Sequence, residues 1–319
     1  MTRHARADLS KVKTISIRTR ESKVSPRQFA VPFKAKHDSF SAFVNGLPDI
    51  LVARDIRGLA RDIVRAKQKR KPVVLMMGAH VVKVGLAPVI IDLMERKVIT
   101  AVAMNSAAAI HDVETALWGQ TSEDVAANML DGRFGMARET GEFINGTLLK
   151  ASWMSDLGYG EALGTELLDV QAKHAKVSIL ASAVRLGIPA TVHAAIGTDI
   201  IHQQPSMDGA ATGEMSFRDF RTLAAVCSKL TGGGVVLNVG SAVIMPEVFL
   251  KALTVARNLG AKARGFTTAV LDMNSHYRPT MNVQRRPTQD GGKGLYITGH
   301  HEIMVPLLAA MIVTELGHD

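Results

Sequence analysis

The sequence lacks several features that would place it in a special class of protein. Its single cysteine, Cys227, cannot form an intrachain disulfide, and the apolar stretch around it favours a buried thiol. No apolar run reaches the roughly 18 residues that a membrane-spanning helix needs, and the N-terminal segment has no apolar secretory signal. At 319 residues and 47% hydrophobic content, we expect a globular cytoplasmic protein with a large core in one or two domains.

Excess positive charge is scarce outside the N-terminal segment. The formal net charge is +9, but residues 1–40 hold ten Lys or Arg against three Asp or Glu. The rest of the chain is therefore close to neutral, which argues against a nucleic-acid-binding domain. We expect residues 1–48 to form a basic, partly disordered arm that could touch an acidic partner or a neighbouring subunit, and residues 49–319 to form one domain.

From about residue 50, short apolar β-prone stretches alternate with longer helical patterns. PVVLMMG (72–78), VVLNVG (235–240) and GLYITG (294–299) are examples of the strand-like stretches. This alternation predicts strand–helix units on a parallel sheet. Residues 112–187 are expected to be mostly helical. The polar segment 273–292 is the longest without a regular pattern and is a candidate active-site or interface loop.

Small and polar residues follow every predicted strand, and in a parallel sheet ligands bind beyond the carboxyl ends of the strands. Seven of the eleven histidines lie at these positions, where imidazole suits acid–base work or metal ligation. There is no HxxxH on a helix and no cysteine cluster, which weakens a metal interpretation. The candidates are Gly78 and His80; Asn105, Ser106, His111 and Asp112; His193, Gly197, Thr198, Asp199 and His202; Asn238, Gly240 and Ser241; Thr267, Thr268, Asp272, Asn274, Ser275 and His276; and His300, His301 and Glu302.

Three of these positions have competing interpretations. The strand–Gly–Ser–helix junction at Gly240 suits a dinucleotide phosphate, because free backbone N–H groups and the helix dipole point there, but it is not GxGxxG and simple close packing is an alternative. Asp112 could bind a ribose hydroxyl or cap a helix. Glu302 could orient a cationic or hydroxyl group, or complement a helix dipole.

Five collinear segments resemble deoxyhypusine synthase: VITAVAMNSAAAIHDVE, LGIPATVHAAIG, VVLNVGSAVIMPEVFLKA, FTTAVLDMNSHYRP and ITGHHEIMVPLLAA. The resemblance covers about residues 70–316. It implies an α/β fold with a Rossmann-like, doubly wound parallel sheet and helices on both faces. It also implies an NAD cofactor and a homotetramer with sites near the dimer interface. Enzymes of that family transfer the aminobutyl group of spermidine to a lysine of a translation factor.

The resemblance also implies which residues would contact NAD. Carried over by position, they are Asn105, Ser106, Asp112, Gly240, Ser241, Thr268, Ala269, Asp272, Ser275, His300 and His301. Gly78 and Asp199 join this set because they follow predicted strands.

The chain departs from that family where the family has its catalytic lysine. Arg278 and Pro279 are followed by TMNVQRRPT, with no lysine and no tryptophan, and the nearest amine is Lys293. Without an imine-forming lysine, aminobutyl transfer to a protein has no carrier. The hypothesis is therefore an NAD-dependent enzyme that acts on a small amine or related metabolite.

In this hypothesis His202, His276 or His301 moves protons, and Glu302 or Asp199 orients the substrate. Lys293, as the nearest amine, is kept as a further catalytic candidate. Two alternatives stay open. One is a metal-assisted hydrolase or lyase that uses the histidines His193, His202, His300 and His301. The other is an oligomer that binds NAD without catalysis.

Overall fold

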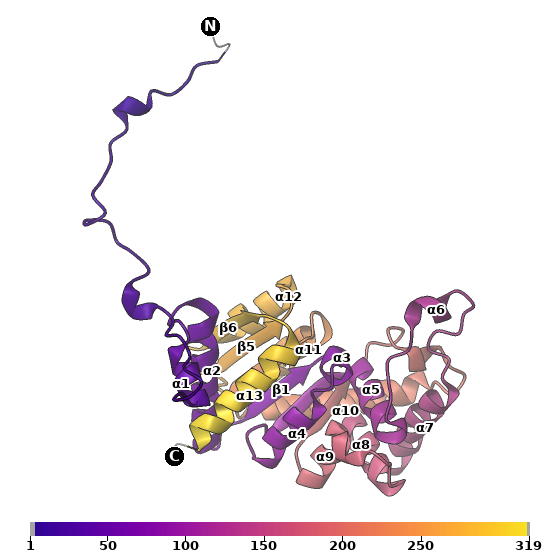
Figure 1. The fold of residues 1–319 in the computed structure, drawn as a ribbon. Coiled ribbons are helices and arrows are strands. Elements are labelled where there is room, and N and C mark those ends of the chain that lie inside the picture. Colours follow the sequence, from indigo (N-terminus) through magenta and orange to yellow (C-terminus); the bar gives the residue numbers. More distant parts are fainter. Residues whose placement is uncertain (1–3, 318–319) are drawn as a thin grey trace.

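Six parallel strands form the sheet at the centre of the fold (Figure 1). The computed structural model describes residues 4–317. The strands are β1 (Val73–Met77), β2 (Ala101–Asn105), β3 (Ala190–His193), β4 (Val235–Val239), β5 (Thr267–Asp272) and β6 (Lys293–Thr298). Their spatial order is β3-β2-β1-β4-β5-β6, which is the strand order of a doubly wound Rossmann sheet. The predicted fold class is confirmed.

Helices connect the strands and flank the sheet. They are α1 (Phe40–Gly46), α2 (Leu51–Gln68), α3 (Ala79–Lys83), α4 (Ala87–Glu95), α5 (Ser106–Trp118), α6 (Val125–Met129), α7 (Arg138–Met154), α8 (Tyr159–Asp169), α9 (Ile179–Leu186), α10 (Gly209–Cys227), α11 (Ile244–Asn258), α12 (Tyr277–Pro279) and α13 (His301–Leu316). In Figure 1, α1 and α2 lie near β6, whereas α6 and α7 lie at the opposite end of the molecule. Short turns of helix lie between these elements, among them η4 (Ile200–Gln203).

The sheet is covered on both faces because alternate strand residues point in opposite directions. Val73 and Leu75 of β1 belong to a core shared with α2, α4 and α13. Val74 and Met76 belong to a second core shared with α10 and α11. All five residues of β1 are buried, as is typical of a central parallel strand. The predicted helices on both faces are confirmed.

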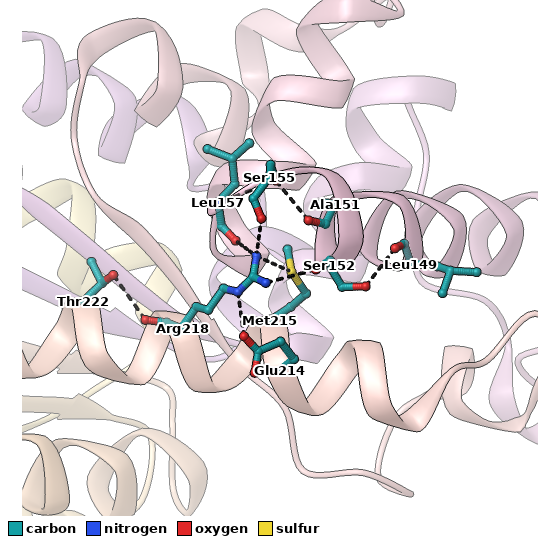
Figure 2. A network of polar contacts seen from close by, with 9 residues as sticks. All are labelled: Leu149, Ala151, Ser152, Ser155, Leu157, Glu214, Met215, Arg218 and Thr222. Atoms are coloured by element: carbon teal, nitrogen blue, oxygen red, sulfur yellow. Dashed lines mark hydrogen bonds and ion pairs between the residues drawn. The ribbon is translucent and has the colours of Figure 1, made fainter.

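One arginine joins α7 to α10 at the β3 end of the sheet (Figure 2). Arg218 of α10 donates from Nη1 to the carbonyl oxygens of Ser155 (2.7 Å) and Leu157 (3.1 Å), and from Nη2 to that of Ser152 (3.0 Å). Its Nε donates to Glu214 at 2.8 Å. The positive guanidinium satisfies carbonyl groups at the end of α7, where the helix dipole is negative. This contact fixes the position of the helices beyond β3.

The N-terminal arm extends away from the body in Figure 1. Residues 4–27 are exposed, including the apolar side chains of Leu9, Ile15 and Ile17. Contact with the body begins near Gln28, whose carbonyl oxygen accepts from the N–H of Asp49 at 3.0 Å. The predicted division into an arm and one domain stays a prediction. Among residues 4–317, no helix has the length and apolar character needed to cross a membrane.

Residues 112–187 are mostly helical, as predicted, although α5 already begins at Ser106, directly after β2. One local prediction was wrong. The segment predicted as an irregular loop at 273–292 consists largely of helical turns: α12, a π-helix (η5, Thr280–Arg285) and a 3-10 turn (η6, Arg286–Thr288). Val283 of this segment is fully buried in the second core. Its polar composition concealed this packing, because only one side of the segment faces the sheet.

Candidate functional site

All six strands are parallel, so their carboxyl ends lie at one edge of the sheet. This edge holds most of the residues that the sequence singled out. They are Gly78 and His80 after β1; Asn105 and Ser106 at the end of β2; His193, Asp199 and His202 at or after the end of β3; Asn238, Gly240 and Ser241 around the end of β4; Asp272, Ser275 and His276 at or after the end of β5; and His300, His301 and Glu302 after β6. We call it the carboxyl edge.

Two glycine turns lie against each other where the strand order reverses, between β1 and β4. Gly78 donates its N–H to the carbonyl oxygen of Val239 at 3.0 Å, and Gly240 donates to that of Leu271 at 3.0 Å. A Cβ at position 78 would overlap the carbonyl oxygen of Gly240, and Gly240 itself has a φ of +64°. Both positions therefore favour glycine. Backbone atoms form the floor of the carboxyl edge at this point, which we call the switch point.

His301 packs directly behind the Gly240 turn. Its side chain is 1% exposed, and a Cβ at Gly240 would come within 3.0 Å of its ring. Nε2 lies 3.2 Å from the carbonyl oxygen of Leu271, so Nε2 must be the donor. Nδ1 is enclosed and has no partner, and the ring of His80 lies 5.5 Å away, centroid to centroid. His301 therefore supports the switch point from within.

A second buried polar side chain, Asn238, holds the same turn from β4. Its Nδ2 donates to the carbonyl oxygen of Ser241 at 2.9 Å, and its Oδ1 is enclosed without a partner. Ser241 Oγ accepts from the N–H of Met245 at 3.2 Å in the first turn of α11. The sequence prediction placed Asn238 at a strand end but gave it no role. The role of Asn238 could have been suspected from the sequence, because it is the one polar residue in the apolar run VVLNV.

On the other side of the switch point, Ser106 of α5 donates a short hydrogen bond to Asp199, which precedes η4. Asn105 begins α5 by accepting from the N–H of Ala108 at 3.0 Å. Ser106 is buried, whereas Asp199 is only half-buried and lines a cavity. The structure therefore brings together Ser106 and Asp199, two residues predicted to bind the cofactor.

His202 is held by backbone groups of the turn that contains Asp199. Its Nδ1 accepts from the N–H groups of Gly197 and Asp199, each at 3.2 Å. The ring proton is therefore on Nε2, an atom that is enclosed and has no partner. This arrangement gives His202 a role in shaping the turn.

The β5 and β6 part of the carboxyl edge is more open to solvent. Asp272 is buried, and His276 Nε2 lies 3.8 Å from its Oδ1. The N–H of His276 donates to the hydroxyl of Tyr296 at 3.1 Å. His300 and Glu302 are both exposed and lie 3.7 Å apart, Nδ1 to Oε1. Of the residues predicted to transfer protons, His276 has the most suitable surroundings, because it lies beside the carboxylate of Asp272 in a part of the edge that is open to solvent.

Four predicted residues lie toward the opposite edge of the sheet from the carboxyl edge. Lys293 is the first residue of β6, about 17 Å from the far end of a six-residue strand, and its Nζ pairs with Asp62 at 3.2 Å. Thr267 is the first residue of β5, and its hydroxyl donates to the same Asp62 at 3.2 Å. Thr268 and Ala269 are the next two residues of β5 and are both fully buried. The structure corrects the predicted location of all four, because each lies near the start of its strand and not at its carboxyl end.

Asp112 occupies the interior between α5 and α9. It is fully buried and accepts from the Ser178 hydroxyl (2.6 Å) and the N–H groups of Ile179 (2.7 Å) and Leu180 (3.1 Å). Burial raises its pKa to about 6, against the lowering effect of these hydrogen bonds. Of the two roles that the sequence left open, this geometry is that of a helix cap, so we leave Asp112 out of the proposed ribose contacts.

The histidines of the metal alternative are not arranged as a ligand set. Within residues 4–317, no group of three or more His, Cys, Asp or Glu side chains is placed to hold a metal ion. His193 lies in the interior with its Nε2 3.0 Å from the Thr191 hydroxyl, and burial lowers its pKa to about 3.

A cavity of about 770 Å³ opens beside α5, on the β2 and β3 side of the switch point. We call it the α5 cavity. Its walls come from α5, the segment 118–139 and residues 198–200. They include Lys83, His111, Trp118, Phe134 and Asp199. A pocket of this volume is large enough for a small organic ligand or half of a dinucleotide.

The residues at the switch point fit the backbone of a dinucleotide. Gly78 and Gly240 leave the floor free of side chains, and the N-terminus of α11 follows Gly240 closely in sequence. The enclosed acceptor atoms Nδ1 of His301 and Oδ1 of Asn238 lie beside this turn without partners. Unpaired buried acceptors are costly, and an enclosed water can satisfy them below the floor on which the dinucleotide would lie.

No protein-family model matches the chain, and no curated protein matches it either. Solved structures do match its fold. The AgrE complex with ornithine and NAD+ gives a TM-score of 0.54 at 12% identity, over 83% of this chain and 34% of AgrE. ArgZ, an arginine dihydrolase from the ornithine–ammonia cycle in cyanobacteria, gives 0.50 at 16% identity, over 83% of this chain and 33% of ArgZ. The chain thus spans about a third of either protein.

A third structure matches nearly end to end. A candidate deoxyhypusine synthase from Entamoeba histolytica gives a TM-score of 0.51 at 13% identity, and the match covers 89% of this chain and 96% of that one. The resemblance to deoxyhypusine synthase found in the sequence is confirmed at the level of the fold.

Proposed function

We propose that the chain is an NAD-dependent enzyme that acts on a small amine or a related metabolite. The observation that carries the proposal is the glycine-lined switch point in a sheet of order β3-β2-β1-β4-β5-β6. The AgrE structure, of the same fold, is a complex with ornithine and NAD+. These two facts together favour a nicotinamide cofactor and an amine substrate.

In this proposal the cofactor lies across the carboxyl edge. Gly78 and Gly240, which carry no side chain, would let its pyrophosphate approach the backbone beside Ser241, aided by the positive end of the α11 dipole. The remaining contacts we propose are Asn105, Ser106, Asp199, Asp272, Ser275 and His300. His301 and Asn238 keep the turn in shape from below, and NAD supplies a hydride acceptor when bound.

Proton movement is assigned to His276. Its Nε2 is 3.8 Å from Asp272 Oδ1, and a carboxylate at that distance can orient the imidazole. Glu302, exposed at the start of α13, would attract a cationic substrate. Aminobutyl transfer to a protein is not part of the proposal, because Lys293 lies at the opposite end of β6.

The assembly and location predicted from the sequence remain part of the proposal. We keep the homotetramer, with its sites near the dimer interface, and the cytoplasmic location. Native mass spectrometry of the purified protein would report the subunit number and any bound nucleotide together. A monomer that carries no nucleotide would contradict both the tetramer and the bound cofactor.

Calorimetric titration with NAD+, followed by NADH absorbance in the presence of a panel of amines that includes L-ornithine, tests the function. We expect NAD+ to bind, and at least one amine to give NADH. The variant Lys293→Ala, altered at the opposite edge, serves as a control and should bind NAD+ like the wild type. Absence of NAD+ binding would refute the proposal, and binding without turnover on any amine would favour the non-catalytic oligomer.

A further inference from the structure

The α5 cavity contains a chain of hydrogen bonds that the proposed function does not use. His111 on α5 lines the cavity, and its Nδ1 lies 2.6 Å from the hydroxyl oxygen of Thr121. Thr121 in turn donates a short hydrogen bond to Oε2 of Glu114, one turn further along α5. Oε1 of Glu114 accepts from the hydroxyl of Thr140 on α7 at 3.0 Å. We call this chain the Glu114 relay.

The direction of the Glu114 relay determines which nitrogen of His111 carries the ring proton. A threonine hydroxyl has one proton, and Thr121 gives it to the carboxylate of Glu114. Thr121 can then only accept from Nδ1, because two lone pairs at 2.6 Å would repel each other. The network therefore requires the Nδ1–H form of His111.

This leaves Nε2 of His111 as an acceptor. Within residues 4–317, Nε2 has no hydrogen-bond partner. It is also not fully enclosed, so a ligand can reach it. Burial, with a smaller contribution from the positive charge of Lys83, lowers the pKa of His111 to about 4. The ring is thus neutral near pH 7 and keeps its lone pair on Nε2.

We propose that His111 determines ligand specificity in the α5 cavity: the Glu114 relay fixes its Nε2 as an acceptor for an N–H or O–H group of the ligand. A phosphate or carboxylate oxygen at that point would face a lone pair and be rejected. An ammonium, amino or hydroxyl group would be bound. The proposal rests on the proposed function, which supplies two possible hydrogen-bond donors to Nε2: the amine substrate and the adenosine half of NAD+.

The tautomer itself can be measured without any ligand. Ring-selective ¹⁵N labelling of histidine reports by NMR which nitrogen is protonated, and the signal that is lost in His111→Phe identifies the residue. We expect the Nδ1–H form in the wild type and a shift toward Nε2–H in Thr121→Val, which removes the relay hydroxyl but leaves the ring in place. An Nε2–H form in the wild type would overturn the proposal.

Binding experiments then test the role of Nε2. Calorimetric titration would use NAD+ and L-ornithine as separate probes. For the probe that reaches His111, the variant His111→Phe should bind about fivefold to tenfold more weakly, as expected for one lost hydrogen bond. His111→Gln, which offers an amide oxygen as acceptor, should recover most of the affinity. His37→Phe, in the exposed arm, is the matched control and should change neither affinity.

The outcomes separate the two sources and the two proposals. Weaker binding of NAD+ alone assigns the donor to adenosine, and weaker binding of ornithine alone assigns it to the substrate amine. Equal binding of both probes by the wild type and His111→Phe would overturn the inference even if NAD+ binds. If NAD+ does not bind at all, the proposed function fails, but a loss of ornithine binding in His111→Phe would still support the inference.

Discussion

At the scale of single residues, the switch point depends on the absence of two side chains. A methyl group at position 78 would overlap the carbonyl oxygen of Gly240 and force the two turns apart. We expect Gly78→Ala to weaken NAD+ binding at least tenfold and to lower the free energy of unfolding by about 1–3 kcal/mol. Titration calorimetry and denaturant unfolding would measure the two effects.

The matched control is Gly213→Ala. This glycine lies within α10, with a helical backbone and nothing within 4 Å of the added Cβ. Alanine there should stabilise the protein by about 0.5–1 kcal/mol, because it restricts the unfolded chain and favours helix. If Gly78→Ala behaved like Gly213→Ala and bound NAD+ normally, the switch point would not be the cofactor site.

A second residue-scale prediction concerns Asp112. Replacing Asp112 by Ala would leave three buried donors, including the N–H groups of Ile179 and Leu180, without an acceptor. We expect a loss of about 2–4 kcal/mol in the free energy of unfolding and no change in NAD+ affinity. A large fall in affinity with unchanged stability would instead reinstate Asp112 as a ribose contact.

At the scale of secondary-structure elements, Arg218 is a test of how the helices beyond β3 are held (Figure 2). Arg218→Met keeps much of the apolar stem but removes hydrogen bonds to three carbonyl groups of the segment 152–157. We expect about 2–4 kcal/mol of destabilisation and faster amide exchange at the end of α7.

Arg221, one turn along α10 and exposed, is the control for this substitution. Arg221→Met should change the free energy of unfolding by less than about 1 kcal/mol. Similar losses for both variants would mean that any arginine on α10 contributes through net charge and that the contacts of Arg218 to α7 carry no special weight.

Elements were easier to predict from the sequence than their arrangement. The six strands are short and apolar between turn residues, so β1 and β4 were found where the pattern placed them. The helical turns at 280–288 were missed, because the segment is mostly polar and only Val283 of it belongs to the hydrophobic core. The same holds for the roles of single residues. The glycines at strand ends could be predicted from the strand pattern alone. The burial of Asp112 and the pairing of His111 with Thr121 could not, because each depends on a contact with another segment of the chain.

At the scale of the whole molecule, buried titratable groups link stability to pH. His193 is neutral in the fold, with its pKa lowered by burial to about 3, whereas the unfolded chain binds a proton near pH 6.5. The free energy of unfolding should therefore decrease as pH falls from about 6.5 toward 3. Buried Asp219, with its pKa raised by burial to about 7, has the opposite effect over part of this range.

The difference between wild type and His193→Gln isolates the histidine contribution. Glutamine can keep a hydrogen bond to Thr191 and does not titrate. We expect the stability of the wild type relative to the variant to decline by up to about 1.4 kcal/mol per pH unit between pH 6 and 4. Denaturant unfolding at several pH values would measure it, and parallel curves for the two proteins would show that His193 is charged in the fold.

The backbone floor of the switch point also bears on how such a protein can be recognised. A contact surface made of backbone amide groups is chemically the same whatever side chains surround it. Such a surface can therefore persist while the surrounding residues are substituted. The solved structures that share the fold of this chain are only 12–16% identical to it. Attempts to alter what this protein binds should therefore begin at the walls of the α5 cavity, which side chains line, and leave the glycine turns intact.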